Sequence, residues 1–114
     1  MLPQINRLRK KKEIDDVFKK GKSQKKDFLV FKIANNNLKD WRFSIIVSKK
    51  VSKKAVVRNK IRRRLSGMIA EKLKNKKTEK PAKDVLIIVL PQIKDKGTNE
   101  IRETFSFLAG NIIK

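Results

Sequence analysis

The chain has 114 residues, of which 32 are Lys or Arg and 11 are Asp or Glu, so its formal net charge is +21. Self-repulsion at this charge opposes a compact state, and a polyanionic partner would relieve it, nucleic acid first and an anionic membrane second. The sequence contains no His and no Cys, which excludes Ser-His-Asp and Cys-His catalysis, thiolate chemistry and zinc sites built from His or Cys.

The hydropathy pattern indicates one folded domain. The longest purely apolar run, residues 85–90, is too short to span a bilayer, and the N-terminus lacks an apolar run of signal-peptide length. Hydrophobic residues make up 39% of the chain and fall into periodic segments, unlike those of a disordered basic tail. We expect a single cytoplasmic domain over residues 1–114, with residues 1–6 flexible and no membrane partner.

The N-terminal part predicts a helix and two strands. Apolar residues at i, i+3 and i+4 indicate a short amphipathic helix: Ile14, Val17 and Phe18. Gly21 would end this helix. Residues 28–33 and 41–48 are rich in β formers and predict two strands, paired antiparallel, with a turn at the three Asn residues 35–37.

The C-terminal part predicts a long helix, a strand and a final helix. Residues 53–77 carry apolar side chains on one helical face: Val57, Ile61, Leu65, Met68 and Ile69. After a charged connection, residues 84–90 form an aliphatic run typical of a central strand buried on both faces. Thr98 would then cap a helix with this inward face: Ile101, Phe105, Leu108, Ala109 and Ile112. The order α-β-β-α-β-α, with room for one strand merged into its neighbour, indicates an α+β sandwich.

The positive charge is concentrated in the middle of the chain. Residues 41–70 contain 10 basic residues and no acidic ones. A charge run usually marks a solvated face, but a solvated helix gains from Glu placed four residues from Lys or Arg, and this segment has no Glu. The segment therefore predicts a nucleic-acid-binding face on residues 49–54 and the helix that follows.

These features leave DNA and RNA open as partners. Base readout in the DNA major groove uses Asn and Gln as well as Arg, and the basic part of the predicted helix, residues 53–65, offers Asn59 alone among the amides. Three rings could stack on unpaired RNA bases: Phe18, Phe28 and Phe31. The alternative for each ring is the core, and strand alternation favours the core for Phe31, because Leu29 and Ile33 share its face.

Residues 48–65 resemble the protein subunit of bacterial ribonuclease P. The family signature is a strand that ends in S-K-K-V, a short turn and a helix with A-V-x-R-N-R-I-K-R, and the chain has S-K-K-V at 48–51 and A-V-V-R-N-K-I-R-R at 55–63. The resemblance extends to R-L at 7–8, V-F-K-K-G at 17–21 and D-V-L-I-I-V at 84–89, and so covers nearly the whole chain.

The resemblance implies a fold and a function. The family fold is α-β-β-β-α-β-α with a four-stranded sheet and a left-handed β-α-β crossover, against the general right-handed rule. In the family, the RNA subunit catalyses the metal-dependent hydrolysis that removes the 5′ leader of precursor tRNA, with Mg²⁺ bound mainly by RNA. The protein would bind ribonuclease P RNA and precursor tRNA, with no small-molecule substrate, and the missing His and Cys agree with catalysis by RNA.

The resemblance also implies site residues. On the RNA-subunit side these are Lys49, Lys50, Lys53, Lys54, Arg58, Asn59, Lys60, Arg62, Arg63 and Arg64. The single-stranded leader would meet Phe18, Phe31, Ile14, Arg58 and Asn59, with Phe31 partly accessible in a groove. The protein itself would supply no catalytic residue and no metal site. Three residues depart from the family pattern: Ile14 replaces a cleft-lining Phe, Ser52 a turn Gly and Lys60 an Arg.

Two other classes of protein stay open. A ribosomal or nucleoid architectural protein would explain the charge but not the signature. A stand-alone nuclease would need clustered carboxylates for two metal ions, and Asp15 and Asp16 are the only adjacent acidic pair.

Overall fold

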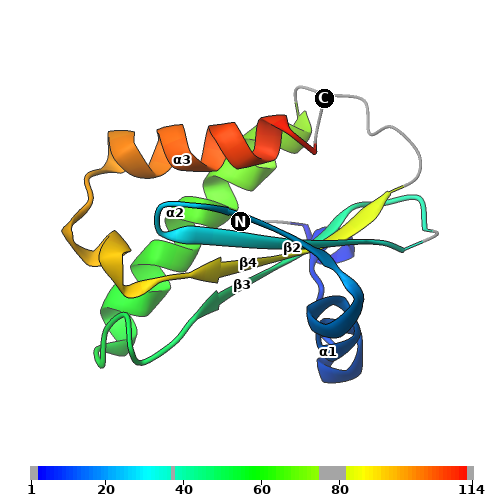
Figure 1. The fold of residues 1–114 in the computed structure, drawn as a ribbon, viewed down its shortest axis with the longest axis horizontal. Helices are drawn as coiled ribbons and strands as arrows, with labels where there is room; N and C mark the ends of the chain where they lie inside the picture. Colours follow the sequence, from blue (N-terminus) through cyan, green and yellow to red (C-terminus); the bar gives the residue numbers. More distant parts are fainter. Residues whose placement is uncertain (1–2, 37, 75–81, 113–114) are drawn as a thin grey trace.

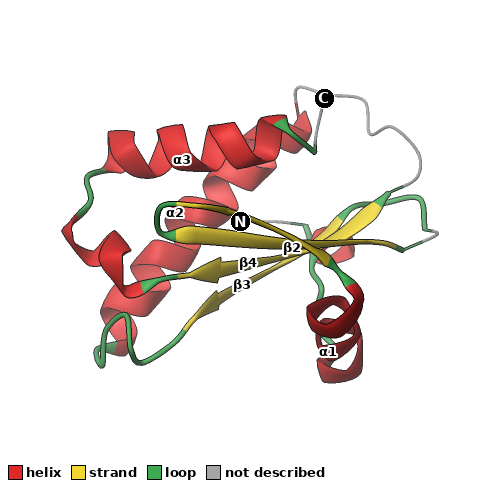
Figure 2. Ribbon diagram, in the orientation of Figure 1, coloured by secondary structure: helices red, strands yellow, loops and turns green. Residues whose placement is uncertain are grey.

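The computed structural model of the chain describes residues 3–36, 38–74 and 82–112. Helices pack on both faces of one sheet in this part of the chain (Figures 1 and 2). The α-helices and strands in chain order are α1 (Lys11–Lys20), β1 (Lys22–Lys26), β2 (Leu29–Asn35), β3 (Arg42–Val47), α2 (Ala55–Lys74), β4 (Lys83–Val89) and α3 (Thr98–Gly110). Short 3-10 helices span Gln4–Asn6 and Pro91–Asp95. The order α-β-β-β-α-β-α is the one that the family resemblance implies.

The four strands are arranged in the order β1-β2-β4-β3. β4 is antiparallel to β2 and parallel to β3, so the predicted antiparallel pairing of residues 28–33 with 41–48 is wrong. β4 separates these two strands because its aliphatic run needs apolar cover on both faces, which only a central strand receives. The left-handedness of the β3-α2-β4 crossover stays a prediction from the resemblance.

β1 is the strand that the sequence does not reveal. Its residues, K-S-Q-K-K, are poor β formers without apolar alternation, and they lie mostly exposed at one edge of the sheet. A two-residue turn joins β1 to β2, with Asp27 at φ 52°, a conformation that Asp tolerates. Lys side chains on an edge strand also discourage pairing with another chain.

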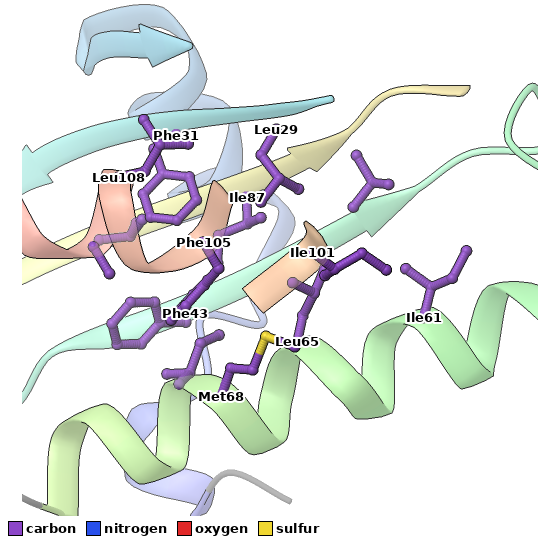
Figure 3. Packing of buried hydrophobic residues seen from close by; sticks show 14 of the residues in the cluster. Leu29, Phe31, Phe43, Ile61, Leu65, Met68, Ile87, Ile101, Phe105 and Leu108 are labelled. Atoms are coloured by element: carbon purple, nitrogen blue, oxygen red, sulfur yellow. The ribbon is translucent and has the colours of Figure 1, made fainter. Parts of the chain in front are cut away.

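The larger core lies between the sheet and the pair α2 and α3. Strand side chains pointing to this side meet the apolar stripes of the two helices (Figure 3). Phe31 is completely buried, and its ring centroid lies 5.9 Å from that of Phe105. Most of the predicted stripes are confirmed, since Ile61, Leu65, Met68 and Ile69 of α2 and Ile101, Phe105, Leu108 and Ala109 of α3 are buried. The other two predicted residues, Val57 and Ile112, are only partly buried against this core, and Ile112 lies beyond the end of α3.

The opposite face of the sheet is covered by α1. Val17 packs with Leu8 and Leu86 in a second, smaller cluster, and Ile14 and Ile46 lie partly buried against it. Arg42 links this helix to the sheet: its Nε and Nη2 donate to the two carboxylate oxygens of Asp84 at 2.8 and 2.7 Å, and its Nη1 donates to Glu13 at 2.9 Å. One face of the sheet is therefore covered by α2 and α3, and the other face is covered by α1.

The helix ends agree only partly with the sequence. Gly21 follows α1 as expected, but with φ −70°, so it ends the helix without a left-handed conformation. Thr98 is the first residue of α3 rather than its cap, because Gly97 holds the cap position and no side chain bonds there. Among residues 1–6, expected to be flexible, Gln4–Asn6 form a 3-10 turn, and Asn6 Nδ2 donates to the Trp41 carbonyl at 2.7 Å. Some predicted positions lie outside the described residues: residues 1–2, Asn37 of the predicted turn, and residues 75–81, which include the predicted end of the long helix and most of the charged connection.

Candidate nucleic-acid interface

A cationic surface is formed by the loop of residues 48–54 and the first turns of α2. The four Lys side chains of the loop are exposed: Lys49, Lys50, Lys53 and Lys54. The loop is anchored by Val51, which is 1% exposed, and by Ser52, whose Oγ accepts the Lys54 amide at 3.2 Å. Ser52 does not have positive φ, so its replacement of a family Gly does not strain the backbone.

Arg58 fixes this loop to the helix. Its Nη1 donates to the carbonyls of Ser52 and Lys53 at 2.9 and 3.0 Å, and its side chain is partly buried. These bonds use donors that the sequence assigned to phosphate. Arg58 therefore positions the two Lys pairs as well as carrying charge itself.

Arg62 connects α2 to the edge strand. Its Nη1 donates to Asn59 Oδ1 at 2.9 Å, and its Nη2 donates to the Val47 carbonyl at 3.3 Å. Lys60 and Arg63 are exposed, Arg64 is partly buried, and Ile61 points inward as predicted. The structure therefore brings together all ten residues expected on the RNA-subunit side, in one stretch of loop and helix.

This surface has no acidic counterions among the described residues. The ion pairs in that part of the chain involve Arg42, Lys96 and Arg102, which lie outside the cationic surface. No group of three or more acidic side chains in the described ranges is placed to hold a metal ion. The cations of the surface are therefore left to pair with an external anion.

A second candidate surface lies on the α1 side of the sheet. Phe18 is 52% exposed, and Lys32 Nζ lies 4.6 Å from its ring centroid. Beside them Val30, Ile88 and Ile46 are register neighbours across β2, β4 and β3, and all three are partly exposed. We call these five residues the aromatic strip. Strand alternation could have identified Lys32, because it points away from the face of Phe31.

The leader residues expected from the sequence do not form one surface. Phe31 points to the α2 and α3 side and has no exposed area, so the expectation that its ring is accessible is wrong. Alternation along β2 determines this, since α3 covers the face that Phe31 shares with Leu29 and Ile33. Ile14 and Phe18 lie on the α1 side, whereas Arg58 and Asn59 belong to α2, which packs on the other side.

Electrostatics near α1 are dominated by Arg42. Its hydrogen bond to Asp84 raises its pKa above the ordinary value, burial opposes that rise, and the bond to Glu13 adds to it. Asn36 Nδ2 also donates to Asp84 Oδ1, at 2.8 Å. Arg42 therefore stays charged well above neutral pH, and its contact with Glu13 ties α1 to the sheet.

Comparison with known proteins agrees with this geometry. The family model described as Ribonuclease P matches residues 2–112. The chain belongs to the ribonuclease P protein family. The ribonuclease P protein component of Synechocystis is 38% identical over 92 residues, covering 80% of this chain and 72% of the relative. That of Staphylococcus epidermidis is 35% identical over 99 residues, covering 86% and 82%.

Solved ribonuclease P proteins share the fold. The Staphylococcus aureus protein has a TM-score of 0.78 at 32% identity, covering 95% of this chain and 96% of that one. The Thermotoga maritima protein has a TM-score of 0.79 at 25% identity, covering 93% and 96%. The α+β fold and the role of a ribonuclease P subunit are thereby confirmed. Within the described ranges, no helix has the length and apolar character needed to cross a membrane.

Proposed function

We propose that this ribonuclease P protein binds the catalytic RNA subunit through the cationic surface and assists the removal of 5′ leaders from precursor tRNA in the cytoplasm. The observation that carries the proposal is the density of cations on residues 49–64, which form no ion pair with an acidic side chain in the described part of the chain. Neutralising RNA phosphates there releases counterions and offsets the repulsion that the cations impose on each other. Bond cleavage is assigned to the RNA, which also holds most of the Mg²⁺.

The second part of the proposal concerns the leader. We place its single strand on the aromatic strip, where the exposed ring of Phe18 can stack on a base and Lys32 can meet a phosphate. Ile14 supports this site from beneath as part of the α1 cluster. Arg58 and Asn59 act on the RNA-subunit side, Arg58 largely through the loop that it holds.

A cleavage assay tests the subunit role. Precursor tRNA is incubated at low Mg²⁺ with a bacterial ribonuclease P RNA, with and without this protein, beside a protein-only control. Stimulation with the RNA and no cleavage by the protein alone is the expected result. Cleavage by the protein alone would indicate a stand-alone nuclease, and binding to duplex DNA without stimulation would indicate an architectural protein.

A further inference from the structure

A cavity of about 480 Å³ lies at the outer edge of β3, next to the cationic surface, with which it shares Asn59, Arg62 and Arg63. Its walls come from the segment before α1, from β3 and from α2. The α2 wall is a single stripe at i, i+3, i+4 and i+7: Asn59, Arg62, Arg63 and Ser66. The volume lies within the range of small-ligand pockets.

The wall formed by β3 exposes backbone groups. Leu8 donates its amide to the Phe43 carbonyl at 2.8 Å, and Arg62 donates to the Val47 carbonyl at 3.3 Å, so both carbonyls point to the open edge. Backbone groups alternate in direction along a parallel strand, so the N–H and C=O of Ile45, between them, point to the same edge. No described residue bonds to these two groups on that side. A donor and an acceptor therefore stand side by side in the cavity without a partner.

We infer that this edge cavity binds one unstacked nucleobase of the RNA held by the cationic surface. Leu8 and Ile45 offer apolar contact to the base, and the Ile45 backbone offers a donor and an acceptor to its hydrogen-bonding edge. Arg62 and Arg63 at the wall can meet the flanking phosphates. A peptide strand would also fit an open edge, but a cationic wall without acidic residues favours a polyanion. The inference rests on the proposed RNA binding and adds a base site to it.

The first test uses the wild-type protein and the amide resonance of Ile45 in ¹H–¹⁵N NMR spectra. The probes are the RNA pentamers A5, U5 and C5 and an abasic pentamer with the same phosphates. We expect the Ile45 amide to shift with at least one base-bearing pentamer and to stay unchanged with the abasic one. Equal shifts with both kinds of probe would assign the site to phosphate, and no shift with any probe would exclude a base; either result overturns the inference.

The second test fills the cavity without changing charge. Ser66→Met adds a long side chain to the α2 wall, and Ser106→Met adds the same side chain on the exposed side of α3 as a matched control. We expect Ser66→Met to weaken binding about tenfold, and Ser106→Met to leave it unchanged. Separate titrations with the ribonuclease P RNA and with precursor tRNA identify which RNA donates the base.

The two proposals fail in different ways. Equal affinity of both Met variants for both RNAs, with cleavage still stimulated, would overturn the base site and leave the subunit role intact. If the wild-type protein does not stimulate cleavage of precursor tRNA, while its Ile45 amide resonance still shifts with the base-bearing pentamers, the subunit role alone would be overturned.

Discussion

Single residues acquire their roles from the face of the sheet on which they lie. Phe31 and Lys32 are neighbours in sequence, yet Phe31 is enclosed by α3 and Lys32 lies over the exposed ring of Phe18. A ring buried among other side chains contributes to stability, whereas a ring that remains half exposed is available to a ligand. Alternation along β2 therefore places Phe31 in the core and Lys32 beside the exposed ring of Phe18.

Phe18→Ala should weaken leader binding with little change in stability. Loss of a stacked ring costs about 1–3 kcal/mol of affinity, while an exposed substitution changes stability by about 0.5 kcal/mol or less. Phe107→Ala is the matched control, because Phe107 is 55% exposed and also lies under a lysine, Lys26, but on α3. Fluorescence titration of precursor tRNA with and without its leader measures the difference. Equal losses of affinity in the two variants would show that Phe18 does not contact the leader.

Arg42→Met should destabilise the fold by about 3 kcal/mol, since it leaves Asp84 buried without its cation. The Arg42 pKa is raised from a value already far above neutrality, so the stabilisation that comes from its charge is complete at neutral pH, and on the alkaline side it is lost as pH rises through that elevated pKa. Arg102→Met is the control, because its 3.2 Å pair with Glu71 is exposed and should contribute less than about 1 kcal/mol. Urea denaturation measures both, and similar losses would contradict the assigned role of Arg42.

At the scale of elements, the features that can be predicted from the sequence are those that depend on the spacing of hydrophobic residues. The faces of α2 and α3 and the central place of β4 follow from apolar spacing and are confirmed. β1 has no such spacing, and the pairing of β3 with β4 is decided by a contact across about forty residues that no local pattern specifies. The basic loop and helix could be predicted from charge, but the aromatic strip and the edge cavity could not, because each combines residues from three or more segments that are distant in the sequence.

Gly21 and Gly67 should respond to Ala in opposite directions. A Cβ at Gly21 would lie 2.5 Å from the Val17 carbonyl and 3.1 Å from the Ile33 amide, both backbone atoms, so Gly21→Ala must shift α1 against β2. We expect a loss of about 1–3 kcal/mol. Gly67 lies within α2 with open space around it, and Gly67→Ala should gain up to about 1 kcal/mol from helix propensity. Thermal unfolding of both variants measures the effect, and a stable Gly21→Ala protein would show that α1 is not held as closely as the structure indicates.

At the scale of the molecule, the charge is segregated. The net charge is +21, and the positive side chains are densest on the 48–54 loop and the start of α2. On the α1 side of the sheet, Glu13 and Asp84 form ion pairs with Arg42. A surface of this kind binds polyanions with a strong dependence on salt. The fold thus separates the cationic surface from the aromatic strip, because α2 and α1 pack on opposite faces of the sheet.

The affinity for the ribonuclease P RNA should fall steeply with salt. If about five side chains meet phosphates, log affinity against log salt should have a slope of about −3.5 to −4.5. Lys53→Gln with Lys54→Gln should make this slope shallower by more than one unit. Lys72→Gln with Lys74→Gln, at the far end of α2, removes the same charge and should change the slope less. Filter binding at salt concentrations of about 50 to 300 mM measures these slopes. Identical slopes for the two pairs would show that the charge acts without a defined surface.

The central position of β4 has a consequence for biosynthesis. β2 and β3 are synthesised long before Lys83–Val89, and neither is hydrogen-bonded to the other, so the growing chain has no complete sheet until β4 is made. Pairing at such sequence separation is also slow. The nascent chain therefore carries its basic segment before it has a complete sheet to position it, and the cationic surface and the aromatic strip take their final shape only after β4 has been made.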